Sequence, residues 1–129
     1  MLSLADFNEE SACNEAQPMP FLDHNGNETG FVLLVLGGQA EQVRKAAAKE
    51  LEKLRRIQTP AHGKGREPTI GEQREANLRG HASRIAGWSG VTDEYTPEAA
   101  YNLCLCNQRV WEQVVEFSEN IGNFTKSKL

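Results

Sequence analysis

The first residues whose types and spacing could do chemistry are Asp23, Asn25 and Asn27, which begin like a calcium-binding loop. Such a loop needs a glycine at its sixth position and a bidentate glutamate at its twelfth. Glu28 and Leu34 occupy those two positions, so the set of oxygen ligands is incomplete. A hairpin turn is the better interpretation, because Asn25 followed by glycine is a strong signal for a tight turn between two strands.

A pair of glycines in Leu36-Gly-Gly-Gln-Ala40 leads from an apolar run into a helical pattern, as phosphate-binding loops do. The stretch lacks the third glycine of the dinucleotide fingerprint and the Gly-Lys-Ser/Thr of a nucleotide-binding loop. A plain strand-to-helix turn explains it. No serine lies in the Gly-x-Ser-x-Gly setting of a hydrolase nucleophile.

Cysteine and histidine give no site either. Cys13, Cys104 and Cys106 are few and odd in number, which argues against a disulfide framework and for a reducing cytoplasm. The spacing Cys-x-Cys suits neither a redox pair nor half of a zinc site, so both of its thiols are predicted to be buried. The histidines share no metal-binding spacing; they are His24, His62 and His81. We therefore predict no enzyme, no metal and no cofactor.

The chain has 129 residues, 39% of them hydrophobic, which predicts one domain over 1–129 with sizeable polar loops. Its longest apolar run, Phe31–Leu36, is too short to cross a bilayer, and the first residues do not resemble a secretory signal. Residues 1–38 carry six acidic and no basic side chains, whereas residues 39–84 carry eleven basic and six acidic ones. Residues 85–129 are acidic again. This order fits head-to-tail association between copies, and equally an ordinary solvated surface.

The hydrophobic pattern predicts an α+β fold that is mostly α, with an N-terminal β-hairpin followed by about four helices and a flexible loop at 59–69. The hairpin with the first long helix takes up 19–58, and residues 70–124 form a helical part. Because six apolar residues follow one another, we expect the second strand to be covered on both faces. Residues 1–18 fit two interpretations, a short helix around Leu2–Phe7 and a mobile acidic lead-in.

Helical spacing is clearest from Gln39 to about Gln58. Its apolar face comprises Ala40, Val43, Ala47, Leu51, Leu54 and Ile57, and its i,i+4 ion pairs are Glu41/Lys45 and Glu52/Arg56. Two prolines and two glycines then predict the loop. A further helix is predicted from near Gly71 to Gly87, with Ala76, Leu78, Ala82, Ile85 and Ala86 as a thin apolar stripe.

The last third holds both tryptophans. Thr96 is predicted to cap a short helix that begins at Pro97. A longer amphipathic helix follows, with apolar side chains at three- and four-residue steps: Val110, Trp111, Val114, Val115, Phe117 and Ile121. Gly122 is expected to close it with a left-handed cap, and a polar tail begins at Asn123.

Large apolar side chains in this third suit a partner-binding surface as well as a core, since Trp and Tyr carry much of the energy of protein interfaces. The candidates for partner contact are Trp88, Tyr95, Val110, Trp111, Val114 and Phe117. The competing interpretation places all six in the core of the monomer.

Three stretches carry a likeness to a known family. They are the hairpin Met19-Pro-Phe-Leu-Asp-x-Asn-Gly with Gly30-Phe-Val-Leu-Leu-Val-Leu-Gly, then Ile85-Ala-Gly-Trp-Ser-Gly-Val-Thr-Asp-Glu-Tyr-Thr-Pro-Glu-Ala-Ala100, and Trp111-Glu-Gln-Val-Val-Glu-Phe with Ile121-Gly-Asn-Phe124. Together they resemble the tail assembly chaperones of long, non-contractile-tailed bacteriophages. The resemblance covers about residues 19–124. Its most specific piece is Trp88-Ser-Gly-Val followed by the acidic Tyr-Thr-Pro-Glu helix start.

The resemblance implies a non-enzymatic protein that acts in the host bacterial cytoplasm during infection and is absent from the finished virion. Its implied partners are the tape measure protein, the tail tube protein and other copies of itself in a homo-oligomer. Many members are also made in a frameshift-extended form, which depends on codons rather than on residues. Neither a membrane nor a cofactor is implied.

The alternative interpretation is a small helical nucleic-acid-binding adaptor that uses the basic segment 44–84. Acidic residues alternate with the basic ones there, and no aromatic residue lies among them to stack on a base. Protein partners are therefore favoured over DNA or RNA. An enzyme without a recognisable motif is a third interpretation.

Overall fold

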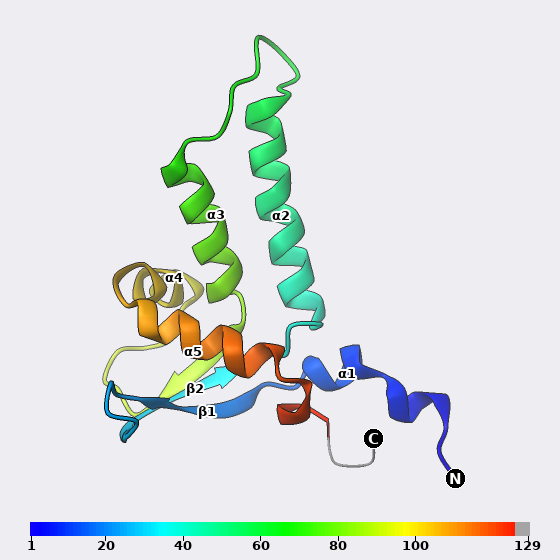
Figure 1. Cartoon of the computed structure of the whole chain (residues 1–129), viewed down its shortest axis with the longest axis vertical. Helices are drawn as coiled ribbons and strands as arrows, with labels where there is room; N and C mark the ends of the chain where they lie inside the picture. Colours follow the sequence, from blue (N-terminus) through cyan, green and yellow to red (C-terminus); the bar gives the residue numbers. More distant parts are fainter. Residues whose placement is uncertain (126–129) are drawn as a thin grey trace.

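In the computed structural model, which describes residues 1–125, a body of sheet and helices carries two projecting helices (Figure 1). The predicted α+β class is confirmed, with a hairpin, four later helices and a loop at 59–69. The elements are a 3₁₀ turn (Leu4–Phe7), α1 (Glu9–Cys13), β1 (Gln17–Leu22), β2 (Glu28–Val35), α2 (Glu41–Gln58), α3 (Ile70–Ala82), β3 (Ile85–Ser89), α4 (Pro97–Cys106), α5 (Gln108–Glu119) and a second 3₁₀ turn (Ile121–Asn123). None of the described helices is long and apolar enough to span a membrane.

Three antiparallel strands form the sheet in the order β1-β2-β3. The central strand places Leu33 opposite Met19 on one side and opposite Trp88 on the other. The inner face of the sheet is covered by α5, which packs on β1 and β2, and by α4, which packs on β3. Leu33, Val35 and Ile85 are fully buried there, and each such side chain contributes about 1.5–3 kcal/mol through burial.

The predicted helix from Gly71 to Gly87 is wrong beyond Ala82, because Ile85–Ser89 form β3. The free edge of β2 supplies backbone partners to this segment, which local helix propensity does not outweigh. Gly87 allows the close approach: a Cβ there would lie only 3.2 Å from Cδ1 of Leu34. The hairpin thereby gains a third strand, and a three-stranded sheet is more stable than an isolated hairpin.

The prediction that β2 is covered on both faces is also wrong. Leu34, on the outer face, is 40% exposed, whereas Leu33 beside it is 0% exposed. Pro18 pairs with Leu34 and shares that outer face, where it is exposed as well. One face on the core and one face open is the common arrangement for an antiparallel sheet.

The free edge of β1 offers few hydrogen-bonding groups. Pro18 and Pro20 have no N–H to present, and an edge strand is where proline is tolerated. Two residues further on, the N–H of Leu22 donates to Oε1 of Gln113 (3.0 Å), and its carbonyl accepts from Nε2 of the same side chain (2.8 Å). Helix α5 therefore occupies the end of this edge.

The predicted turn at Asn25-Gly26 is present, but Gly26 alone has a left-handed φ (83°) among these residues. Oδ1 of Asp23 accepts from the N–H groups of Asn25 (2.9 Å) and Asn27 (3.0 Å), and the carbonyl of Asp23 accepts from Gly26 (3.0 Å). The acidic side chain that suggested a cation loop is thus used by the turn itself.

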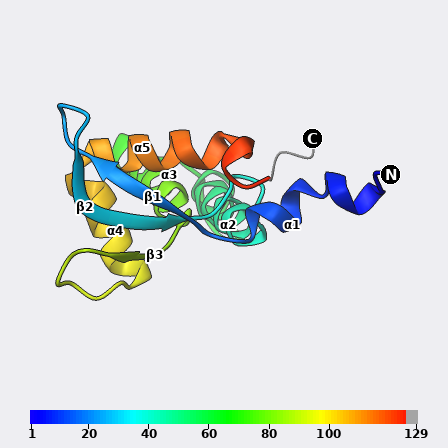
Figure 2. The same ribbon diagram turned by 90° about the horizontal axis from the view of Figure 1, so that it is seen from below.

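Helices α2 and α3 lie side by side and project from the body as an arm, with the loop at its tip; Figure 2 shows them end-on. The predicted Glu41–Lys45 ion pair forms at 2.8 Å. The predicted apolar face of α2 is covered in part: Val43 is buried and Leu54 and Ile57 are half-buried, but Leu51 is 66% exposed. The arm is therefore a helical hairpin whose apolar side chains are only partly covered.

A buried polar junction joins the arm to the body. Oγ of Ser118 donates to the carbonyl of Leu36 (2.7 Å) and accepts from Nη1 of Arg84 (2.8 Å). The same Nη1 lies 2.8 Å from Oε1 of Glu119, and the N–H of Leu36 donates to the carbonyl of Arg84 (2.7 Å). Strand β2, the end of α3 and helix α5 are fixed together at this point.

Both C-terminal helices begin at side-chain caps. Oγ1 of Thr96 accepts from the N–H of Ala99 (3.0 Å) and Pro97 takes the first helical position, as predicted. Oδ1 of Asn107 accepts from the N–H of Val110 (3.3 Å) at the start of α5. One residue therefore ends α4 and begins α5, which sets the sharp turn between them.

The left-handed cap predicted at Gly122 is wrong. Helix α5 ends at Glu119 and is followed by Asn120, whose Oδ1 accepts from the N–H of Gly122 (3.2 Å) at the start of a 3₁₀ turn. The predicted polar tail begins later than Asn123, because Phe124 is buried. Residues 126–129 of that tail lie outside the described part of the chain.

Candidate protein-binding groove along α3

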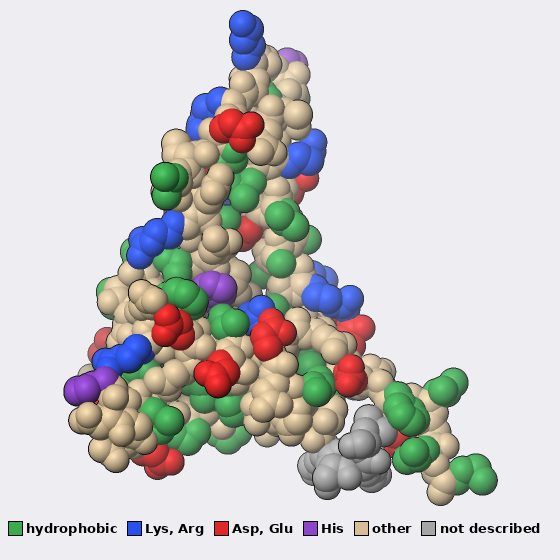
Figure 3. All heavy atoms as spheres, in the orientation of Figure 1, with side chains coloured by type: hydrophobic (Ala, Val, Ile, Leu, Met, Phe, Trp, Pro, Cys, Tyr) green, Lys and Arg blue, Asp and Glu red, His purple; other side chains and the backbone are tan. Residues whose placement is uncertain are grey.

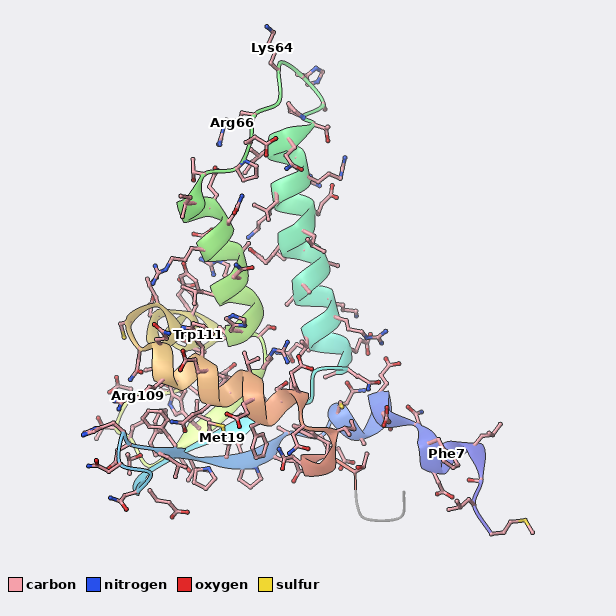
Figure 4. All side chains as sticks on the ribbon, in the orientation of Figure 1. Phe7, Met19, Lys64, Arg66, Arg109 and Trp111 are labelled. Atoms are coloured by element: carbon pink, nitrogen blue, oxygen red, sulfur yellow. The ribbon has the colours of Figure 1, made fainter. Side chains whose placement is uncertain are left out.

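A groove of about 550 Å³ runs along one face of α3 to the junction of α4 and α5. We call it the α3 groove. The side chains of α3 that line it recur at three- and four-residue steps: Ile70, Gln73, Arg74, Asn77, Leu78 and His81. The opposite wall consists of Cys104, Leu105, Cys106, Gln108 and Trp111. Figure 3 shows hydrophobic and basic side chains together on this side of the molecule, and Figure 4 places Trp111 at the foot of α3.

The upper rim of the groove is positioned by the cap of α3. Oγ1 of Thr69 accepts from the N–H of Glu72 (3.1 Å), and Oε1 of Glu72 accepts from the N–H of Thr69 (2.9 Å). This reciprocal pair fixes the first turn of the helix. Ile70 follows the cap and is 86% exposed, and Leu105 across the groove is 40% exposed. Two large apolar side chains thus stay in contact with water at the rim.

The floor of the groove is aromatic. The rings of His81 and Trp111 stack, with their centres 4.7 Å apart and their planes 12° apart. Burial, and then the positive charge of Arg84, lowers the pKa of His81 below its ordinary value, so the imidazole is neutral at pH 7. The indole of Trp111 also packs against the main core. The floor is therefore a flat, uncharged surface held by the rest of the protein.

The groove also carries positive charge. Nη2 of Arg74 donates to the carbonyl of Leu105 (3.4 Å), which holds the guanidinium beside the apolar rim. Arg109, exposed at the start of α5 (Figure 4), does not line the groove itself but directly follows Gln108, which does. Neither arginine forms an ion pair with a carboxylate of residues 1–125. A ligand with apolar and acidic groups would meet both kinds of partner here.

Most other cations of the basic segment are already paired. Of the eleven Lys and Arg side chains in residues 39–84, eight form ion pairs with carboxylates: Arg44, Lys45, Lys53, Arg55, Arg56, Arg66, Arg79 and Arg84. The predicted Glu52–Arg56 pair is among them, at 3.3 Å. Paired cations release few counterions on binding a polyanion, so this charge pattern weakens the nucleic-acid interpretation.

The carboxylate of Glu72 is expected to titrate near pH 2. Bidentate hydrogen bonds from Arg66 (2.7 and 3.0 Å), then the N–H of Thr69, lower its pKa from 4.5 to about 2. Because the folded pKa is the lower one, the stabilisation of the α3 start is complete above about pH 4.5 and is lost as the pH falls towards 2. An NMR titration of the side-chain carboxyl carbon measures this. Arg66→Gln should raise the midpoint, and a wild-type midpoint near 4.5 would contradict the assignment.

The cysteines are free, and they divide by burial. Cys13 and Cys104 are buried, but Cys106 is exposed, so the predicted burial of both thiols in Cys-x-Cys is wrong for Cys106. Positions two apart on α4 point about 200° apart, which sends one to the core and the other outwards. Burial, and then Cys106, raises the pKa of the Cys104 thiol to about 12, so it stays protonated at neutral pH.

Within residues 1–125, no three His, Cys, Asp or Glu side chains are grouped so that they could hold a metal ion. No protein-family model, curated protein or solved structure matches the chain. What the protein does is therefore inferred from its residues and from the α3 groove.

The structure divides the six predicted partner residues. Val110 and Val114 are 1% and 0% exposed in the main core, so their assignment to a partner surface is wrong. Both belong to the apolar stripe of α5, and that stripe packs against the sheet. Trp111 lines the α3 groove and is half-buried.

The remaining three are half-buried and lie elsewhere. Nε1 of Trp88 donates to the carbonyl of Asp93 (2.9 Å), and the hydroxyl of Tyr95 donates to the carbonyl of Ile85 (2.7 Å). With their rings 5.2 Å apart, these two fasten the loop before α4 to β3. Phe117 packs against the end of the chain's described part. The six residues therefore form no single surface.

Sequence reasoning missed Ile70, Arg74 and Leu105. Helical spacing did not single them out, because the groove joins two helices that are far apart in the sequence. The available signal was Ile70, a large apolar side chain directly after a cap and followed by Gly71 and Glu72. A large apolar side chain at this position lies outside the apolar stripe predicted for its helix, so burial in the core of the monomer does not account for it.

Proposed function

We propose that this protein is a tail assembly chaperone of long, non-contractile-tailed bacteriophages. It binds the tape measure protein and tail tube subunits during tail assembly, associates with copies of itself, and leaves before the virion is finished. The sequence likeness over residues 19–124 supports the proposal. The observation that carries it in the structure is the open α3 groove with its exposed apolar rim.

The chemistry of the groove suits one face of an amphipathic helix. A helix presents apolar side chains at three- and four-residue steps, and these can lie between Ile70 and Leu105 and on the ring of Trp111. Arg74 would then meet acidic side chains at the edge of that face. A chaperone for a long helical protein has to cover such faces until tube subunits replace it, and a groove that is open and only moderately apolar allows release.

The test is co-expression with the tape measure protein encoded in the same genome. Ile70→Asp combined with Leu105→Asp places two charges at the rim, where the side chains are exposed and the fold does not depend on them. We expect wild type to keep the tape measure protein soluble and to co-purify with it. The double variant should lose at least nine-tenths of the co-purified protein, with an unchanged melting temperature.

Leu51→Asp is the matched control, because it adds the same charge at an exposed apolar position of α2 outside the α3 groove. It should behave as wild type. Failure of wild type to retain the tape measure protein would overturn the proposal. So would tight, steeply salt-dependent binding of DNA that the rim substitutions leave intact, since that result would favour the nucleic-acid adaptor.

A further inference from the structure

Residues 1–7, which we call the leading segment, project from the body in both ribbon views (Figures 1 and 2). Their direction is set by α1, which is fastened to the body. Cys13 is 0% exposed in a small second core, and Oδ1 of Asn14 accepts from the N–H of Glu41 (2.9 Å). Glu10 forms an ion pair with Arg44. The leading segment therefore leaves the body along a defined path.

The leading segment is apolar without burying anything. Met1, Leu2, Leu4 and Phe7 are all more than half exposed, which makes them four of the ten large hydrophobic side chains exposed on the described chain. Figure 3 shows hydrophobic side chains gathered along this projection. The backbone is nevertheless organised, since Oδ2 of Asp6 accepts from the N–H of Ser3 (2.8 Å) across a 3₁₀ turn. Apolar groups clustered on an ordered projection are typical of an interaction site.

The one charged side chain of the leading segment, Asp6, is opposite in sign to Arg74 of the α3 groove. Residues 1–38 contain six acidic and no basic side chains, and Asp6 lies among the exposed apolar groups. The groove offers Arg74, without a carboxylate partner in residues 1–125, beside two further exposed hydrophobic residues, Ile70 and Leu105. An apolar surface with an acidic group and an apolar surface with a basic group are complementary.

The two surfaces cannot meet within one chain while α1 is in place. In Figures 1 and 2 the leading segment extends to one side of the molecule, and α4 with the start of α5 lies on the other. Helix α2 packs against α3 and stands between them. Closing the distance would require α1 to give up the burial of Cys13 and the contacts of Glu10 and Asn14.

We infer that the leading segment of one copy docks in the α3 groove of a second copy. Each copy then carries one donor segment and one acceptor groove, so the contact is head-to-tail and builds rings or open chains of copies. This inference rests on the proposed function, which includes self-association, and names the two surfaces that would form the contact. A client helix and the leading segment compete for the same groove, so client binding shortens the chains of copies by mass action.

Two variants of the full chain test this. Leu4→Asp with Phe7→Asp disables the donor and keeps the groove, whereas Ile70→Asp with Leu105→Asp disables the acceptor and keeps the donor. All four positions are exposed, so both variants should melt as wild type does. By sedimentation velocity, wild type should show a mass that rises with concentration, and each variant alone should remain a monomer. An equimolar mixture should give dimers and nothing larger, because only one donor and one groove remain intact.

A mixture that stays monomeric, a wild type that stays monomeric at millimolar concentration, or variants that associate as wild type does would each overturn the inference. Leu51→Asp should associate as wild type does. Arg74→Glu should weaken association at least tenfold, and raised salt should weaken wild type in the same direction. The donor variant separates this inference from the proposed function, because its groove is intact and free. If the mixture dimerises but the donor variant retains no tape measure protein, self-docking stands and the chaperone proposal fails.

Discussion

Replacing Leu33 by alanine is expected to lower the free energy of unfolding by about 3 kcal/mol, within the range of about 2–5 kcal/mol for a buried leucine. Leu33 is 0% exposed at the centre of the middle strand. Its side chain belongs to the core that holds the sheet against α4 and α5, so truncation leaves a cavity that the close-packed neighbours do not fill. Urea unfolding at pH 7, followed by circular dichroism, measures the change.

Leu34→Ala is the matched control, because the next residue of the same strand lies on the outer face and is 40% exposed. It should cost less than about 1 kcal/mol. Equal losses for the two substitutions at low protein concentration would mean that the outer face is covered in the monomer, contrary to the fold described above.

Gly37→Ala is expected to destabilise the protein by about 2 kcal/mol, as overpacking of a tight core site does. A Cβ at this position would lie 2.3 Å from Sγ and 2.6 Å from Cβ of Cys13, distances that atoms do not tolerate. The N–H of Gly37 also donates to the carbonyl of Cys13 (3.0 Å), so the backbones cannot simply separate. Helix α1 should therefore detach, which hydrogen exchange would detect as lost protection of residues 9–14.

Gly38→Ala provides the control at the neighbouring position. The three atoms nearest to its added Cβ belong to the carboxylate of Glu119, at 2.9–3.1 Å, and the far end of that flexible side chain can move. Gly37→Ala should also weaken self-association, because detaching α1 removes the fixed direction of the leading segment. Full protection of residues 9–14 in Gly37→Ala would show that Cys13 and Gly37 are not packed as described.

Local signals in the sequence predicted what local physics controls. Thr96 and Pro97 correctly predicted the start of α4, and Asn25-Gly26 correctly predicted the hairpin, because a cap or a turn is specified by a few adjacent residues. The length of α2 followed from its periodicity. These features need no knowledge of what lies across the molecule.

Features that depend on distant partners were predicted poorly. Ile85–Ser89 has the spacing of a helix end but becomes a strand, because β2 offers an edge that the sequence order does not reveal. For the same reason the run of six apolar residues wrongly predicted a strand covered on both faces. The helices form a single layer, which buries Leu33 on the inner face of the sheet and leaves Leu34 exposed on the outer face.

The candidate site illustrates the same limit. Periodicity identified the apolar stripe of α5, but the stripe itself cannot distinguish a side that faces the chain's own sheet from a side that faces another protein. Val110 and Val114 proved to be core, and Trp111 lies at the border. The groove is made by bringing α3 beside the α4–α5 turn, and that juxtaposition is a property of the tertiary fold.

The edge of β1 has a consequence for a protein with several large hydrophobic side chains exposed on its surface. A further strand would have to form hydrogen bonds with the backbone N–H and C=O groups of this edge. Pro18 and Pro20 have no N–H, and the backbone N–H and C=O of Leu22 are already bonded to the side-chain amide of Gln113. Strand-to-strand stacking of copies through the β1 edge is thereby disfavoured. At the β1 edge of the sheet, the chain can therefore keep hydrophobic side chains exposed without offering a full set of backbone groups to another strand.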